Sequence, residues 1–210
     1  PLLNALICVR LMEMTLRCGN GKHSSMAFVC YAVVCHMRED HATAVEYGRA
    51  AVALAADHSP YTRAVVRFLT LTFFGVFEHH PREVIQKYDA ALREGVAHGE
   101  VVASHLIDGA VTTLPHLGPD ISHVQDALKQ YEREARTMGA KSSLEMIGLV
   151  RCWAELLDSG VTSDTVDGQN ALEREVEHAS FAAGRDILRM QIEYLAGNDA
   201  EVLRLGRAVR

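Results

Sequence analysis

The chain has 210 residues, 49% of them hydrophobic, and a formal net charge of −6 at pH 7 with charges of both signs interspersed. This composition supports a folded core, while the lack of a basic block excludes the usual electrostatic surface of a nucleic-acid-binding protein. The longest strongly apolar run, residues 26–35, is shorter than the roughly 20 residues of a membrane-spanning helix. We therefore expect neither nucleic-acid nor membrane partners.

Apolar residues recur every three to four positions along almost the entire chain, and Pro and Gly fall mainly between these segments. This pattern predicts an all-α protein. In chain order, helices are expected over residues 2–16, 24–38, 42–56, 61–77, 81–98, 101–117, 121–138 and 142–157, and then over 171–183, 185–195 and from 201 onward. The helix over 61–77 is apolar almost all round, so we expect it to be the most buried.

The clearest of these helices lies within residues 80–100. Pro81 stands just inside its start and Gly99 just past its end, the positions that these residues favour at helix termini. One side carries the apolar residues Val84, Ile85, Tyr88, Leu92 and Val96, whereas polar and charged side chains take the other. Such a helix must bury its apolar side against neighbouring helices.

Residues 159–170, SGVTSDTVDGQN, are rich in Ser, Thr, Asp and Gly, which predicts a loop. We therefore expect a helical-repeat array over 1–158, a loop over 159–170 and a further helical pair over 171–210. The first residue is not methionine and the chain stops within a helical pattern, so we expect a piece of a longer protein.

Three segments that follow short turns align around a tyrosine: AVEYGRAAVALAADH, VIQKYDAALREGVAHG and VQDALKQYEREARTMGA. Their tyrosines, Tyr47, Tyr88 and Tyr131, are 41 and 43 residues apart. These intervals lie within the window of about 40–47 residues for long helical-pair repeats. Because short joints place successive helices antiparallel, we predict antiparallel helical pairs stacked as a tetratricopeptide-like α–α superhelix. A helical bundle without true repeats is the alternative.

Three further stretches resemble one protein family in their order of turn, small and aromatic residues. They are REDHATAVEYGRAAVALAADH, the aromatic helix RAVVRFLTLTFFGVFEHHPREVI, and YDAALREGVAHGEVVASHLI. Through them the chain from about residue 28 to 158 resembles the helical region of very large hybrid signalling kinases. In that family a serine/threonine-kinase-like domain and an AAA-like ATPase precede a tetratricopeptide-like region, and a GAF sensor and a histidine kinase follow it. Regulators resembling the maltose-type transcription activators contain similar helical regions. The resemblance implies a sensing or relaying module within an ATP-dependent protein kinase.

The segment Gly19–Ser24, GNGKHS, resembles the end of a phosphate-binding loop. The motif needs a glycine where Leu16 stands, and Ser or Thr where His23 stands. A glycine-capped turn between helices explains it better.

Zinc-type side chains gather at Cys30, Cys35, His36 and His41. Two side chains five residues apart on a helix point about 140° away from each other around its axis, so Cys30 and Cys35 do not lie on the same side. Two acid–base pairs can be imagined, at Glu78-His79-His80 and at His105 with Asp108, but neither has a nucleophile at a helical spacing. We predict no catalytic residues, no cofactor and no metal site.

Arg63 and Arg67 are four residues apart on the most apolar helix, so they share one side and cannot both lie unpaired in a core. The functional interpretation is a basic strip in a concave groove that meets an acidic partner segment. The alternative is internal pairing with carboxylates on the adjoining helix. Arg151 beside the lone Trp153 raises the same two alternatives.

The sequence thus favours a non-catalytic helical-repeat scaffold or regulatory module that contacts protein segments or flanking domains of a signalling kinase. The odd number of cysteines, five in a chain too apolar to depend on disulfides, indicates reduced thiols and a cytoplasmic location. Homo-oligomerisation stays open. The competing class is a small all-α enzyme or metal-binding protein that uses the His and Cys residues.

Overall fold

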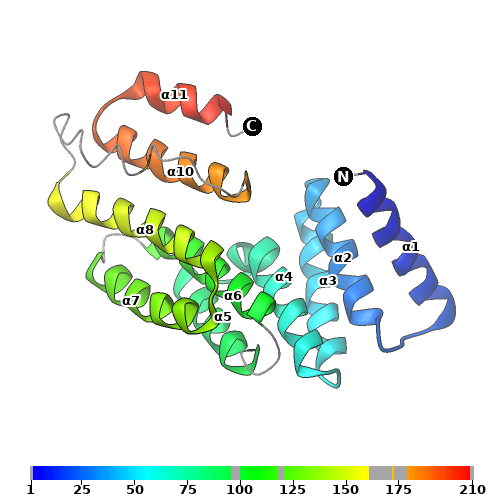
Figure 1. Cartoon of the computed structure of the whole chain (residues 1–210). Coiled ribbons are helices and arrows are strands. Elements are labelled where there is room, and N and C mark those ends of the chain that lie inside the picture. The colour runs from blue at the N-terminus through cyan, green and yellow to red at the C-terminus, as the bar shows by residue number, and fades with distance from the viewer. Residues whose placement is uncertain (1, 96–99, 118–120, 161–171, 173–178, 209–210) are drawn as a thin grey trace. The chain divides into compact units, whose positions relative to one another are not determined.

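The architecture is all-α, as predicted. A computed structural model describes residues 2–95, 100–117, 121–160, 172 and 179–208, and every regular element in these ranges is a helix (Figure 1). The helices are α1 (Leu2–Cys18), α2 (Ser24–Met37), α3 (His41–Ala55), α4 (Pro60–Glu78), α5 (Pro81–Gly95), α6 (Glu100–Thr113), the 3₁₀ helix η2 (Leu114–Leu117), α7 (Ile121–Met138), α8 (Lys141–Ser159), α10 (Ala179–Leu195) and α11 (Asp199–Ala208). None of the described helices is long and apolar enough to cross a membrane.

Successive helices pack as antiparallel hairpins with short joints: α2 with α3, α4 with α5, α7 with α8, and α10 with α11. Capping residues mark the joints between successive helices. Asp40 accepts a hydrogen bond from the Thr43 N–H (3.2 Å) at the start of α3, and Ser59 accepts one from the Thr62 N–H (3.3 Å) at the start of α4. Gly139 has a φ of 70°, the left-handed conformation that ends α7.

The helix starts recur with a period of about 40 residues, which supports the predicted helical-pair repeat. The helices α3, α5 and α7 begin at His41, Pro81 and Ile121, and the helices α4, α6 and α8 begin at Pro60, Glu100 and Lys141. This interval lies at the lower edge of the window of about 40–47 residues for such repeats.

The buried positions repeat in the same register. The buried residues are Ala44, Gly48 and Ala51 on α3, Val84, Tyr88 and Ala91 on α5, and Val124, Leu128 and Tyr131 on α7. In this register Tyr88 corresponds to Gly48, and Tyr131 corresponds to Ala91. The three tyrosines that suggested the repeat therefore do not occupy equivalent positions.

The chain divides into two compact units, residues 1–110 and 111–210. The core of the first unit lies between α2, α3 and α4 and consists of Val29, Ala32, Cys35, Ala44, Ala51, Ala55, Val66 and Phe74. Its alanines allow the helices to approach closely. The division falls inside α6. Residues 161–170 of the predicted loop lie outside the described part of the chain.

Two details of the helix predictions are wrong. The helix α4 is not the most buried, because Tyr61, Val76 and Phe77 are about half exposed, whereas α6 buries most of its residues. Small residues such as Ala103 on α6 allow neighbours to cover it closely. The expected break before Arg185 is also absent, since α10 continues through Gly184 from Ala179 to Leu195. Most of the helix expected over 171–183 lies outside the described residues.

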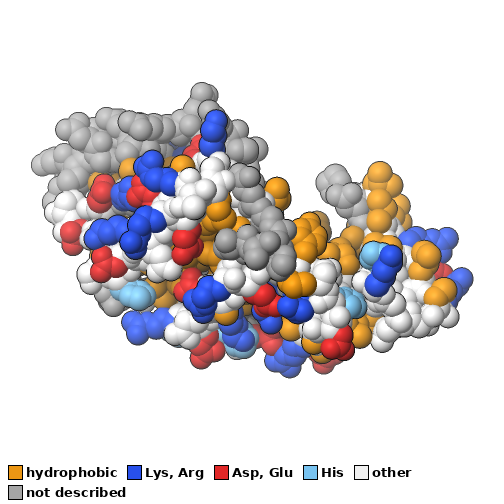
Figure 2. All heavy atoms as spheres, turned by 60° about the horizontal axis from the view of Figure 1, so that its bottom comes forward, with side chains coloured by type: hydrophobic (Ala, Val, Ile, Leu, Met, Phe, Trp, Pro, Cys, Tyr) orange, Lys and Arg blue, Asp and Glu red, His pale blue; other side chains and the backbone are white. Residues whose placement is uncertain are grey.

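The helix α1 exposes an unusual amount of apolar surface, which Figure 2 shows over this end of the chain. Met12 is buried, but Leu3, Leu6, Met14 and Leu16 have exposed fractions of 57–70%. Apolar patches of this kind in folded proteins commonly take part in interactions.

Candidate functional site

A groove of about 620 Å³ runs along α4 in the first unit, with α3 on one side and α5 on the other. The helix α4 contributes more lining residues than either α3 or α5. Arg67, Leu71, Gly75 and Glu78 follow one another at steps of four, four and three residues, so they lie on one face of that helix. The volume is within the range of about 300–1,000 Å³ that is common for ligand sites.

Small side chains keep this groove open. Ala53 on α3 and Ala90 on α5 stand on opposite sides, and Gly75 lies on α4 between them. At Gly75 a Cβ atom would already be 3.4 Å from the Val84 side chain, so the close packing of α4 on α5 also favours glycine there. The result is a mainly apolar bed, to which Val52 and Leu71 contribute as well.

The groove has a basic lining. Arg49, Arg67 and Lys87 are its cations, and Glu78 is its one carboxylate among the described lining residues. Arg49 Nε donates to Glu78 Oε1 (2.5 Å), which links α3 to α4. Lys87 is exposed and forms no ion pair or hydrogen bond with any described residue.

Arg63 and Arg67, the predicted partner-binding residues, pair internally in the structure. Arg63 Nε donates to Glu94 Oε1 (2.6 Å) and its Nη1 donates to the His58 carbonyl (2.8 Å), while Arg67 Nη1 donates to Glu94 Oε2. The hydrogen bond from Arg63, with the charges of both arginines, lowers the pKa of Glu94. The geometry thus matches the alternative of pairing with the adjoining helix.

Only one of the two arginines reaches the groove. Arg67 lines it, whereas Arg63 does not. Because two guanidinium groups share the single carboxylate of Glu94, one positive charge remains at this end of the groove. A partner-binding role for Arg63 and Arg67 stays a prediction, but it no longer follows from a lack of internal partners.

The zinc-type residues on α2 and α3 lie in an aromatic environment. His36 and His41 face each other with their Nδ1 atoms 3.2 Å apart, and the His41 ring stacks on Phe77 at 4.6 Å between centroids. Burial, together with His41, lowers the pKa of His36. The described residues contain no group of three or more His, Cys, Asp or Glu side chains placed to hold a metal ion.

The cysteines of this region do not readily lose their thiol protons. Burial raises the pKa of Cys30 to about 11, with a smaller contribution from Cys8, and burial also raises the pKa of Cys35. A thiol must lose its proton to bind zinc or to act as a nucleophile. Their surroundings therefore do not activate either thiol as a nucleophile.

The other sequence candidates occupy structural positions. Gly19 has a φ of 82° in the turn between α1 and α2, and the Gly21 N–H donates to Ser24 Oγ (2.8 Å). The His105 ring stacks on Phe68 at 5.2 Å between centroids, and Glu78 is held by Arg49. These contacts give Gly19, Gly21, His105 and Glu78 structural roles, and His79 lines the groove beside Glu78.

In the second unit Arg151 pairs with Glu132 on α7 at 2.5 Å, and Trp153 is buried. Trp153 also lines a cavity of about 520 Å³ with Leu157, Gln191 and Tyr194. The Trp153 Nε1 and Gln191 Oε1 atoms are buried and have no hydrogen-bond partner among the described residues. The sequence did not indicate this cavity, because no spacing within a single helix relates α8 to α10.

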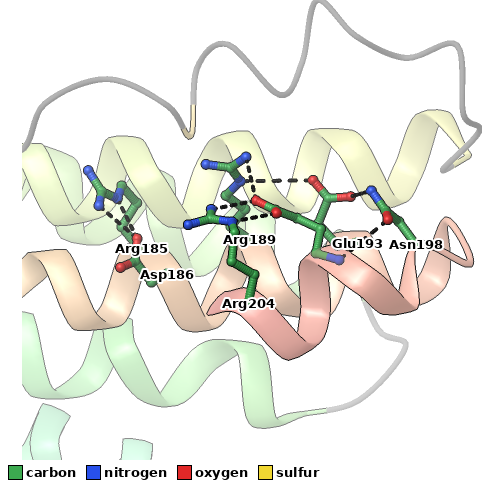
Figure 3. Close-up of polar contacts among 7 residues, drawn as sticks. Arg185, Asp186, Arg189, Glu193, Asn198 and Arg204 are labelled. Atoms are coloured by element: carbon green, nitrogen blue, oxygen red, sulfur yellow. Dashed lines mark hydrogen bonds and ion pairs between the residues drawn. The ribbon is translucent and has the colours of Figure 1, made fainter. Parts of the chain in front are cut away.

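A charged network joins α10 to α11 (Figure 3). Glu201 receives hydrogen bonds from Arg204 Nε and Nη2, both 2.6 Å long, and lies 3.0 Å from Arg189 Nη2 on α10. Asn198 Nδ2 donates to the buried Glu193 carboxylate (3.0 Å). The hydrogen bonds from Arg204 lower the pKa of Glu201. Since these charges compensate one another across the hairpin, the network stabilises the pairing of the two helices.

Arginine–glutamate pairs between successive helices recur along the described chain. They are Arg49–Glu78, Arg63–Glu94 with Arg67–Glu94, Arg151–Glu132 and Arg189–Glu201. Sequence reasoning anticipated a pairing only for the α4 and α8 arginines and named no partner. The partners are between 12 and 31 residues away, beyond the reach of helical periodicity.

Comparison with known proteins adds no family to this description. Neither a protein-family model, nor a curated protein sequence, nor a solved structure matches the chain.

Proposed function

We propose that this chain is a non-catalytic helical-repeat module that binds a segment of another protein or of a flanking domain. The observation that carries the proposal is the groove along α4, which offers an apolar bed and three cations between three packed helices. Stacked helical pairs commonly bind partners over surfaces of this kind.

The ion pairs around the groove favour a preformed site. Arg49 is held by Glu78, and Arg67 is held by Glu94, so their guanidinium groups are already ordered before a partner arrives. When side chains are already ordered in the free protein, binding costs less conformational entropy and the affinity is higher. This supports recognition of a partner segment. Glu78 and His79 both line the groove, but the Glu78 carboxylate is already held by Arg49.

By the resemblance described above, we further propose that the module belongs to a cytoplasmic hybrid signalling kinase and relays signals between its domains. The gene sequence on both sides of residues 1–210 tests this part directly. Kinase-like and AAA-like ATPase motifs upstream, with a GAF sensor and histidine kinase downstream, would support it. Flanking sequence without any of these motifs would contradict it.

Photo-crosslinking tests the groove as a binding site. A p-benzoylphenylalanine residue at Ala90, in the groove, is compared in cells with one at Ala42, which is exposed on α3 and does not line the groove. We expect one discrete adduct from position 90, lost when Ala53→Trp fills the groove, and no such adduct from position 42. Equal adducts from both positions, or adducts that persist with Ala53→Trp, would contradict the proposal.

The alternative of a metal-binding protein rests on one observation, the 3.2 Å separation of the His36 and His41 Nδ1 atoms. Two imidazole nitrogens are fewer than the three or four protein ligands of known zinc sites. Elemental analysis of the purified protein separates the two candidates. Stoichiometric zinc that is lost in His41→Ala would favour the metal-binding function.

A further inference from the structure

Resting on the proposed function, we infer that the groove along α4 takes an acidic protein segment, with apolar side chains on the bed and carboxylates at Arg67, Lys87 and Arg49. Three observations support this: the apolar bed, the sign of the charge around it, and the order of the cations along the groove.

The bed suits short apolar side chains. Leu71 lies at its centre with an exposed fraction of 8%, and Val52, Ala53 and Ala90 flank it from α3 and α5. Thr70 also faces the groove, but its hydroxyl donates to the Val66 carbonyl (2.8 Å) and is therefore already satisfied. An aliphatic side chain placed here removes apolar surface from water without leaving a polar group unpaired.

The charge around the bed is opposite to that of the chain. The whole chain carries −6, yet the groove is lined by three cations and one carboxylate. Glu78 compensates Arg49, and Glu94 is shared between Arg67 and Arg63, so positive charge remains in excess. A negatively charged partner is attracted to this groove and repelled by much of the remaining surface.

The cations are spread along the groove. Arg67 and Glu78 are eleven residues apart on α4, which corresponds to ~16 Å along the helix axis. Glu78 holds Arg49 at one end, and Arg67 marks the other. Lys87 lies between them, because α5 runs antiparallel to α4 with Val84 against Gly75 and Glu94 against Arg67.

This spacing fits a helix of two to three turns whose acidic residues recur every turn. It does not suit a nucleic acid, because three cations over an apolar bed give too few phosphate contacts for binding at physiological salt.

Fluorescence anisotropy with a synthetic peptide tests the inference. The probe is a fluorescein-labelled helical peptide with leucine at every fourth position and glutamate at the flanking positions, and the matched peptide has glutamine in place of every glutamate. We expect the acidic peptide to bind with a dissociation constant on the order of micromolar, and the glutamine peptide about tenfold more weakly. Added salt should weaken the binding of the acidic peptide and leave the binding of the glutamine peptide unchanged.

Charge reversal locates the binding site. Lys87→Glu should weaken binding of the acidic peptide by about tenfold, because Lys87 is exposed and has no described partner to lose. The matched control is Lys22→Glu, in the exposed turn before α2, which should leave binding unchanged. Ala53→Trp, which fills the bed, should abolish binding of both peptides.

The outcomes separate this inference from the proposed function. If Ala53→Trp blocks the crosslink at position 90 but the acidic and glutamine peptides bind equally, the groove binds a protein segment of different chemistry and the inference is wrong. No binding of the acidic peptide, or an equal effect of Lys22→Glu and Lys87→Glu, also overturns it. Displacement of the peptide by a single-stranded oligonucleotide would indicate a nucleic-acid partner instead.

Discussion

Tyr88 shows how a single residue is constrained in this fold. Its side chain is buried, its hydroxyl shares a hydrogen bond with Thr72 (2.9 Å), and burial raises its pKa to about 12. Its ring occupies the space next to Gly109, where a Cβ atom would lie 2.5 Å from the ring. The apolar stripe predicted that Tyr88 is buried, and this is confirmed, but nothing in the sequence paired it with Gly109.

Gly109→Ala should destabilise the chain by about 2 kcal/mol, because the added methyl group collides with the buried Tyr88 ring and neither can move freely. Gly148→Ala is the matched control, since Gly148 lies inside α8 and an added Cβ atom would meet no described residue within 4 Å beyond its chain neighbours and the helix's own backbone. The control substitution should stabilise the folded chain by about 0.5–1 kcal/mol, because alanine favours the helical conformation more than glycine does. Urea unfolding followed by circular dichroism measures both, and equal effects of the two substitutions would contradict the close contact.

Tyr88→Asp should destabilise by more than about 3 kcal/mol, because it places a charge in the packed stripe of α5. Tyr88→Phe keeps the ring and removes only the hydroxyl that meets Thr72, so about 1 kcal/mol should be lost. Thermal melts compare the two variants with the parent chain. A melting temperature for Tyr88→Asp within a degree or two of the parent's would refute this placement of the residue.

At the scale of helices, the recurring arginine–glutamate pairs make stability depend on pH. The arginines lower the pKa values of Glu94, Glu132 and Glu201, so each carboxyl binds a proton more weakly in the folded chain than in the unfolded chain. The resulting stabilisation is present above the ordinary carboxyl pKa and is lost as the pH falls through the lowered values.

We therefore expect the melting temperature to drop when the pH is lowered below about 4.5. Glu94→Gln should reduce this drop, since one of the perturbed carboxyls is gone and its neutral substitute does not titrate. Glu46→Gln is the control, because Glu46 is exposed and has no described partner. Melts at neutral and acidic pH measure the difference. Equal pH dependence of the parent and Glu94→Gln would show that this pair does not control acid stability.

The exposed apolar surface of α1 bears on the oligomeric state, which the sequence left open. Self-association should bury Leu6 and Leu16 of two copies against each other, since a two-fold dimer uses the same patch twice. Sedimentation velocity should then show a larger species as the protein concentration rises. Leu6→Lys should abolish it, whereas Leu203→Lys, at an equally exposed leucine on α11, should not. A monomer at every concentration would contradict the expectation.

At the scale of the whole molecule, two compact units and a repeat of about 40 residues imply that unfolding is not all-or-none. Trp153 is the one tryptophan, so its fluorescence reports only the unit formed by residues 111–210. Gly48→Val should destabilise the other unit, because a Cβ atom there would lie 2.9 Å from the Phe74 ring.

We expect Gly48→Val to lower the urea midpoint measured by circular dichroism more than the midpoint measured by Trp153 fluorescence. Circular dichroism averages over all helices, whereas the indole senses its own unit. Equal shifts by both methods would mean that the whole chain unfolds as one cooperative structure.

The amino-acid sequence by itself determined the all-α class, most helix boundaries and the buried stripe of α5. These properties depend on residues three or four positions apart and on capping groups such as Asp40 and Ser59, which act within one turn. The tertiary structure alone decided that Arg63 and Arg67 share Glu94, that Tyr88 packs on Gly109, and that a groove lies along α4. Each of these joins residues on different helices, and local periodicity carries no information about how far apart two helices pack or which of their faces meet.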